Sequence, residues 1–69
     1  MKITMYTVND IPKTLKALAN KNINIDVASF CRILNERLYR GQKVVNILNT
    51  EIVLTPNFIG EYDGVKGRD

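Results

Sequence analysis

The sequence has no histidine, no tryptophan and a single cysteine, Cys31. One cysteine cannot form a disulfide within the chain, and without histidine it does not supply the ligands of a structural zinc site. The four glycines do not follow the spacing of a nucleotide-binding loop, and no serine has a plausible base. We therefore expect a protein that is not an enzyme and that uses no cofactor and no metal.

Long apolar runs are also absent. No stretch approaches the roughly 18 residues that span a lipid bilayer. Near the N-terminus, polar residues such as Thr4 and Asn9 do not fit a secretory signal. These two absences predict a cytoplasmic protein without a membrane partner.

The chain is short, with 69 residues of which 45% are hydrophobic. A domain of this size buries only about 60% of the surface that its unfolded chain exposes. We expect residues 1–56 to form a single compact domain and residues 57–69 to form a loose C-terminal tail. Because oligomerisation is a common way to stabilise so small a core, we also expect a homodimer.

Basic residues gather in the first part of the chain. Residues 1–43 contain eight basic and three acidic residues, whereas residues 44–69 contain two basic and four acidic residues. A basic domain attracts polyanions such as nucleic acid. The alternative is that these charges only keep a small protein soluble.

The clearest element is a helix from Asp26 to Gly41. Asp26 is suited to cap the first turn through its carboxylate, and Gly41 is suited to the left-handed conformation after the last turn. The apolar stripe of this helix comprises Val27, Phe30, Cys31, Leu34 and Leu38. Because Cys31 lies within the stripe, we interpret it as a core residue rather than as a reactive thiol.

A strand over residues 1–8 and a helix over residues 11–21 precede this element. On one face of the strand the side chains are apolar, Ile3 and Met5, and on the other they are Lys2, Thr4 and Tyr6. The apolar face of the helix comprises Ile11, Leu15, Leu18 and Ala19, and another face carries Lys13 and Lys16. The Asn-rich residues 20–25 are expected to connect the two helices, with a very short strand as the alternative.

After Gly41 the pattern predicts a β-hairpin over residues 43–55. If Asn49-Thr50 forms the turn, Val45 lies opposite Leu54. The weak turn signal leaves open a register that differs by one residue.

Three apolar side chains stand out in the segment after the hairpin. They are Phe58, Ile59 and Tyr62. These residues either close the edge of the core or form a binding site for a partner.

The order strand, helix, turn, helix over the first 40 residues resembles the ribbon-helix-helix family of DNA-binding repressors, which are common in phages and plasmids. The segments that carry the resemblance are MKITMYTV, LKALA at residues 15–19, and the ladder of Phe30, Leu34 and Leu38. It implies a dimer whose paired strands form an antiparallel ribbon that enters the major groove. The residues that would contact base edges are Lys2, Thr4 and Tyr6, and those that would contact phosphates are Lys13, Lys16, Lys21 and Arg32.

A shorter resemblance links the segment MKITMYTVND to the first strand of small glutaredoxin-type electron carriers. The redox pair of that family would fall near Ile11 and Thr14, where no cysteine stands. This resemblance therefore implies a shared fold without the redox chemistry.

The predicted fold is α+β, with a strand, two helices and a hairpin around a core like that of the ribbon-helix-helix family. The leading functional hypothesis is a small DNA-binding transcriptional regulator of phage or plasmid type. The alternative is an adaptor or inhibitor that binds and blocks a host protein. It would be a monomer in which the first strand joins the hairpin in a three-stranded sheet.

Overall fold

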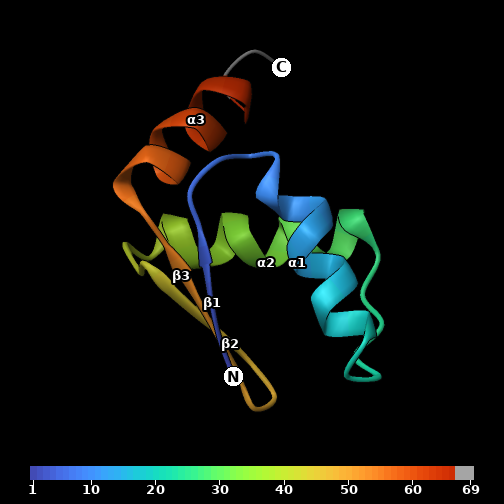
Figure 1. Ribbon diagram of the computed structural model, residues 1–69. Coiled ribbons are helices and arrows are strands. Elements are labelled where there is room, and N and C mark those ends of the chain that lie inside the picture. Colours follow the sequence, from blue (N-terminus) through green and yellow to red (C-terminus); the bar gives the residue numbers. More distant parts are fainter. Residues whose placement is uncertain (67–69) are drawn as a thin grey trace.

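The computed structural model describes residues 1–66, and residues 67–69 lie outside the described part of the chain. The elements follow the order β1 (Lys2–Met5), α1 (Asp10–Ala19), α2 (Val27–Tyr39), β2 (Val44–Ile47), β3 (Thr50–Leu54) and α3 (Pro56–Lys66). Figure 1 shows α1 and α2 on one side of the sheet and α3 beyond the end of β3. The predicted α+β class and the order strand, helix, helix, hairpin are confirmed, and a third helix follows.

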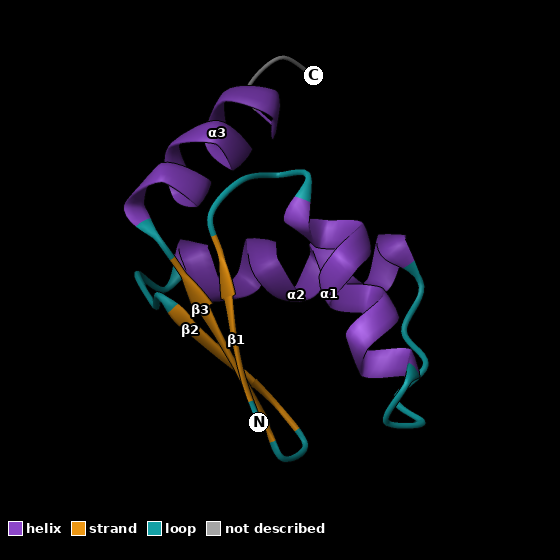
Figure 2. Cartoon of the chain, viewed as in Figure 1, coloured by secondary structure: helices purple, strands orange, loops and turns teal. Residues whose placement is uncertain are grey.

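The three strands form one mixed sheet in the order β1, β3, β2, drawn in orange in Figure 2. β1 runs parallel to β3, with Lys2 opposite Glu51 and Met5 opposite Leu54. β2 runs antiparallel to β3 in the hairpin. The first strand therefore pairs with the hairpin of its own chain, and only its outer edge is left for a ribbon between two chains.

One face of the sheet is buried against the helices. The buried apolar residues come from every element and are Met5, Leu18, Phe30, Leu34, Val45, Ile52, Leu54, Phe58 and Tyr62. Burial alternates along β3, as expected for a strand with one face toward the core and one toward solvent. None of the helices within residues 1–66 has the length and apolarity that crossing a membrane requires.

The hairpin differs from the prediction in its turn. The turn residues are Leu48 and Asn49, so Val45 lies opposite Ile52, and the predicted pairing of Val45 with Leu54 is wrong. The set of inward-facing residues is unchanged, because both registers keep the same alternation. Leu48 has a φ of 52° in this turn, a left-handed conformation that tight hairpin turns need and that leucine rarely adopts, so residue preferences did not predict the turn here.

α1 buries Leu18 and Thr14, which lie one turn apart and are 0% and 2% exposed. Ala19 is exposed, so the prediction that it belongs to the buried apolar face is wrong. It lies past the centre of the buried stripe. The chain turns away from the helix at Asn22, whose φ of 66° lets the Ile23 amide donate to the Leu18 carbonyl at 2.9 Å. The connection between the helices is therefore a capped turn and not a short strand.

Both predicted ends of α2 are confirmed. The Asp26 carboxylate accepts a hydrogen bond from the Ser29 amide at 3.2 Å, and Gly41 has a φ of 75°. Val27 is 58% exposed, so its predicted burial is wrong. The reason is that residues 26–28, from the cap into the first turn, all lie at the surface.

Residues 57–66 of the segment predicted as a loose tail belong instead to helix α3 (Pro56–Lys66), and residues 67–69 of that segment lie outside the described residues. The Phe58 amide donates to the Thr55 hydroxyl at 3.1 Å, and Pro56 stands in the first turn, where its missing donor costs nothing. Phe58 and Tyr62, one turn apart, are 0% and 8% exposed, with ring centroids 5.6 Å apart. This packing offsets the two glycines within the helix, each of which costs about 1 kcal/mol relative to alanine.

Candidate functional site

The three predicted base-contacting residues lie together on the face of the sheet that points away from the core. Lys2 and Tyr6 are exposed, and Thr4 is half-buried. On the other face of the strand, Met5 is fully buried and Ile3 packs against the core. The predicted division of this strand into two faces is therefore confirmed.

The hairpin strands extend this surface with residues that the sequence did not assign to any site. The surface, called here the open face, consists of Lys2, Thr4, Tyr6, Val44, Asn46, Glu51 and Val53. Tyr6 is 61% exposed and Val44 is 38% exposed, so within residues 1–66 no helix covers them. The mixed outer face of the predicted hairpin was a signal for these residues. The alternative in which the first strand joins the hairpin in a three-stranded sheet, which is the arrangement observed, predicted that this strand would extend the same surface.

The strand register arranges the open face in two rows. One row is polar and consists of Lys2, Glu51 and Asn46. The next row is mostly apolar and consists of Thr4, Val53 and Val44. Tyr6 follows the apolar row at the carboxyl end of β1, so the apolar and aromatic atoms gather at one end of the face.

Tyr6 is fixed at one end of the open face, beside the apolar row, by the connection from β1 to α1. The Asp10 carboxylate accepts hydrogen bonds from the Tyr6 amide at 2.7 Å and from the Thr7 amide at 3.0 Å. These bonds lower the pKa of Asp10, because they favour its charged form. The Asn57 side chain donates to the Tyr6 carbonyl at 2.7 Å, so α3 also holds this residue.

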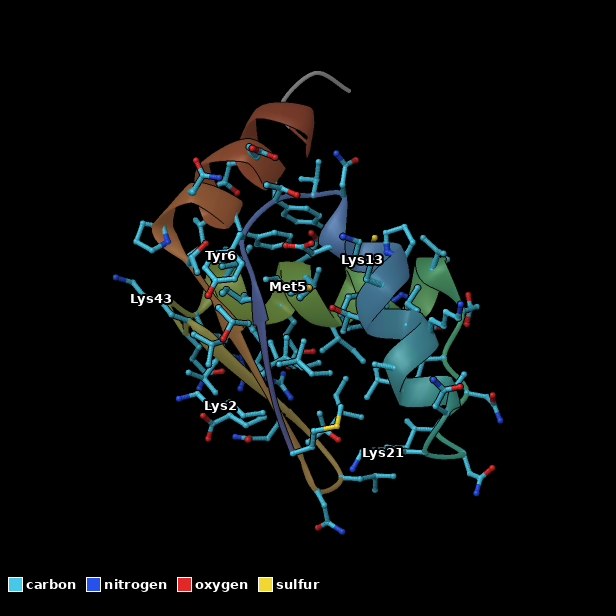
Figure 3. All side chains as sticks on the ribbon, in the orientation of Figure 1. Lys2, Met5, Tyr6, Lys13, Lys21 and Lys43 are labelled. Atoms are coloured by element: carbon cyan, nitrogen blue, oxygen red, sulfur yellow. The ribbon has the colours of Figure 1, made fainter. Side chains whose placement is uncertain are left out.

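A second exposed surface lies on α1 and the turn after it. This lysine face consists of Lys13, Lys16 and Lys21. Figure 3 shows Lys13 and Lys21 beside α1, whereas Lys2 and Tyr6 lie on the opposite side of the sheet. Residues 11–25 contain no acidic residue. The ion pairs found in the described part of the chain are centred on Glu36 and involve none of these lysines.

The seven predicted nucleic-acid contacts therefore do not form one surface. Three lie on the open face and three on the lysine face. Arg32 is exposed on α2. Hydrogen bonds from Ser29 lower the pKa of Asp26, and the charge of Arg32 adds a small contribution in the same direction.

The residues predicted to bind a partner through the C-terminal segment belong to the core instead. Phe58 and Tyr62 are buried and Ile59 packs against the core, so the core-closing interpretation is right and the partner site is wrong for the two buried rings. The Tyr62 hydroxyl donates to the Asn35 side-chain oxygen at 2.7 Å, which ties α3 to α2. Burial raises the pKa of Tyr62 to about 12.

The hollows of the surface lie beside the hairpin turn. The larger has a volume of about 560 Å³, is broadly open, and is lined by residues that include Met1, Leu48 and Glu51. Within residues 1–66, no three His, Cys, Asp or Glu side chains gather as metal ligands would. The larger hollow is therefore an open depression of the surface rather than an enclosed cavity.

Comparison of the chain with protein-family models, with curated proteins and with solved structures finds no match. The open face and the lysine face are therefore the features of the described chain that bear on its function.

Proposed function

We propose that this protein is a non-enzymatic protein-binding domain, of the adaptor or inhibitor type, that docks onto another polypeptide through the open face. The observation that carries the proposal is the exposure of Tyr6 and Val44, at 61% and 38%, on a sheet face over which no helix of residues 1–66 packs. An uncovered sheet face is normally lined by polar side chains. Here the row of Thr4, Val53 and Val44 is mostly apolar.

The composition of the open face suits an interface between proteins. Tyrosine is enriched among the residues that contribute most to protein binding, and polar side chains commonly form the rim around them. Tyr6 and the apolar row would form such a centre, with Lys2 and Glu51 toward the rim. The strands and the anchored β1–α1 connection hold these side chains in place before binding, which lowers the entropic cost of association.

Two exposed valines provide a matched test of this proposal. A photo-cross-linking amino acid is placed at Val44, on the open face, or at Val27, at the start of α2, in the full chain in its native cells. The two positions are 38% and 58% exposed. We expect a discrete cross-linked polypeptide from position 44 and none from position 27, with the product identified by mass spectrometry.

The contrast between the two positions decides the outcome. Equal cross-linking from both valines would mean that the label reports exposure alone, and the open face would lose its special role. Absence of a product at position 44, while the folded chain is recovered, would overturn the proposal.

A DNA-binding regulator is the second candidate, and the lysine face favours it. Lys13, Lys16 and Lys21 lie in a stretch without acidic residues, and such a surface attracts phosphates. A dimeric ribbon-helix-helix arrangement would additionally need the outer edge of β1 to pair with a second copy. Lys2, Thr4 and Tyr6 would contact base edges only in that arrangement.

Salt dependence tests the second candidate. Replacing Lys13, Lys16 and Lys21 with Gln should flatten the slope of log K against log salt by about 2.7, because each phosphate contact contributes about 0.9. The measurement is a titration of duplex DNA at several salt concentrations. Lys43→Gln is the control, since Lys43 is exposed, lies outside the lysine face and is not a predicted DNA contact, so its loss should leave the slope nearly unchanged. A wild-type chain without measurable DNA binding at low salt would remove this candidate.

A further inference from the structure

We propose that the polypeptide that docks on the open face is a second copy of this chain, packed sheet against sheet about a two-fold axis parallel to the strands. The inference rests on the proposed protein-binding function and names the partner of the same face. Its basis is the placement of one positive and one negative side chain, Lys2 and Glu51, side by side on neighbouring strands.

In the described part of the chain, the two charged residues of the open face, Lys2 and Glu51, form no ion pair. Lys2 lies directly opposite Glu51 in the parallel register of β1 and β3. The ion pairs present within residues 1–66 join Glu36 to Arg37 and Arg40, and neither Lys2 nor Glu51 takes part in one. Lys43 is also charged, and it precedes β2 at the outer edge of the sheet.

Because Lys2 and Glu51 lie in the same row, the open face of one copy is complementary in charge to the open face of a second copy. A two-fold axis that lies midway between β1 and β3, parallel to them, sets β1 of one copy over β3 of the other. Lys2 then faces Glu51 of the second copy, and Thr4 faces Val53 of the second copy, because each of these pairs shares a row. Both contacts occur twice. The strands of the two sheets stay close to parallel, which is the aligned mode of sheet packing.

Charge also decides where the axis lies. An axis over the central strand β3 would bring Glu51 against its own copy, and like charges placed opposite each other destabilise an interface. An axis between β1 and β3 avoids this contact and forms two ion pairs instead. β2 then lies one strand beyond the overlap, beside β1 of the second copy, so that a cross-linker at Val44 still reaches the interface while Lys43 lies outside it.

The size of the face predicts a weak dimer. Three strands about 4.8 Å apart, with five residues of about 3.3 Å in the longest, span about 14 by 16 Å. This footprint is smaller than the roughly 800 Å² that each partner buries in a standard interface. We therefore expect a dissociation constant in the micromolar to millimolar range, so that the dimer forms at high concentration.

Two charge reversals test the arrangement. K2E makes both positions of the row acidic, and E51K makes both basic, so each variant alone should dimerise at least about tenfold more weakly than the wild type. An equimolar mixture of the two should associate as well as the wild type does, because the acidic row of one chain then faces the basic row of the other. Sedimentation velocity over a concentration series measures all four samples.

K16E is the matched control, because it makes the same change of charge on the lysine face. It should dimerise like the wild type, and weakening as large as in K2E would overturn the proposal in favour of an effect of net charge. A mixture that fails to associate would also overturn it. Circular dichroism verifies that each variant is folded.

The outcomes separate this inference from the proposed function. A wild-type chain that stays monomeric up to about 1 mM overturns the dimer. If position 44 then cross-links to a different protein, the proposed protein-binding function is supported, but the proposal that the partner is a second copy is overturned. If position 44 yields no product at all, both proposals fail.

Discussion

Leu48 shows how a single residue sets the geometry of the hairpin. It occupies the first turn position with a φ of 52° and leaves 79% of its surface exposed. A left-handed conformation costs an L-residue with a branched side chain roughly 1–2 kcal/mol, whereas glycine adopts it freely. The chain therefore keeps an exposed, strained leucine where glycine would fit better.

Replacing Leu48 with Gly should raise the free energy of unfolding by roughly 0.5–1 kcal/mol, because relief of the strained φ exceeds the entropic cost of glycine. Urea denaturation measures the change. Asn49→Gly is the matched control in the same turn, and it should give no gain, since Asn49 does not have a positive φ. Equal stabilisation by both variants would show that the turn needs flexibility rather than a left-handed residue.

Among the secondary-structure elements, α3 is the one that the sequence pattern did not predict. Its two glycines and alternating charges are typical of a loose segment, and only Phe58 and Tyr62, one turn apart, indicated a buried face. The helix is stabilised because both rings are buried in a core to which every other element contributes. A contribution that depends on tertiary packing cannot be read from local propensity.

The link between α3 and α2 predicts a dependence of stability on alkaline pH. Burial raises the pKa of Tyr62 to about 12, so the folded state favours the neutral hydroxyl. Its stabilising effect is complete below the ordinary pKa of about 10 and is lost as the pH rises through the raised value. Between pH 10 and 12 we expect a loss of about 2 kcal/mol that Tyr62→Phe largely removes.

Tyr39→Phe is the matched control for this prediction, because the Tyr39 side chain is 92% exposed. Chemical denaturation at several pH values compares the two variants with the wild type. Lysine titration affects all three proteins alike and cancels in the differences. Identical pH profiles for Tyr62→Phe and the wild type would contradict the burial argument.

At the scale of the whole molecule, the sequence predicted elements better than their assembly. The caps at Asp26 and Gly41 and the inward set of the hairpin followed from local rules of helix ends and strand alternation. The pairing of β1 with β3 did not, because a strand with one apolar face is compatible with a partner in its own chain or in another. The pairing of β1 with β3 also determines which residues form the open face, because it brings Tyr6 onto the same surface as Val44 and Glu51.

The parallel pairing of β1 with β3 has a consequence for the way the chain folds. Lys2 and Glu51, 49 positions apart, must meet before the sheet is complete, and closing so long a loop costs entropy that local helices do not pay. The central strand β3 is synthesised after α1 and α2. During synthesis, β1 therefore has no strand to pair with until β3 has been made. We expect α1 and α2 to form early and the sheet to close last, on the slower timescale of folds rich in distant contacts.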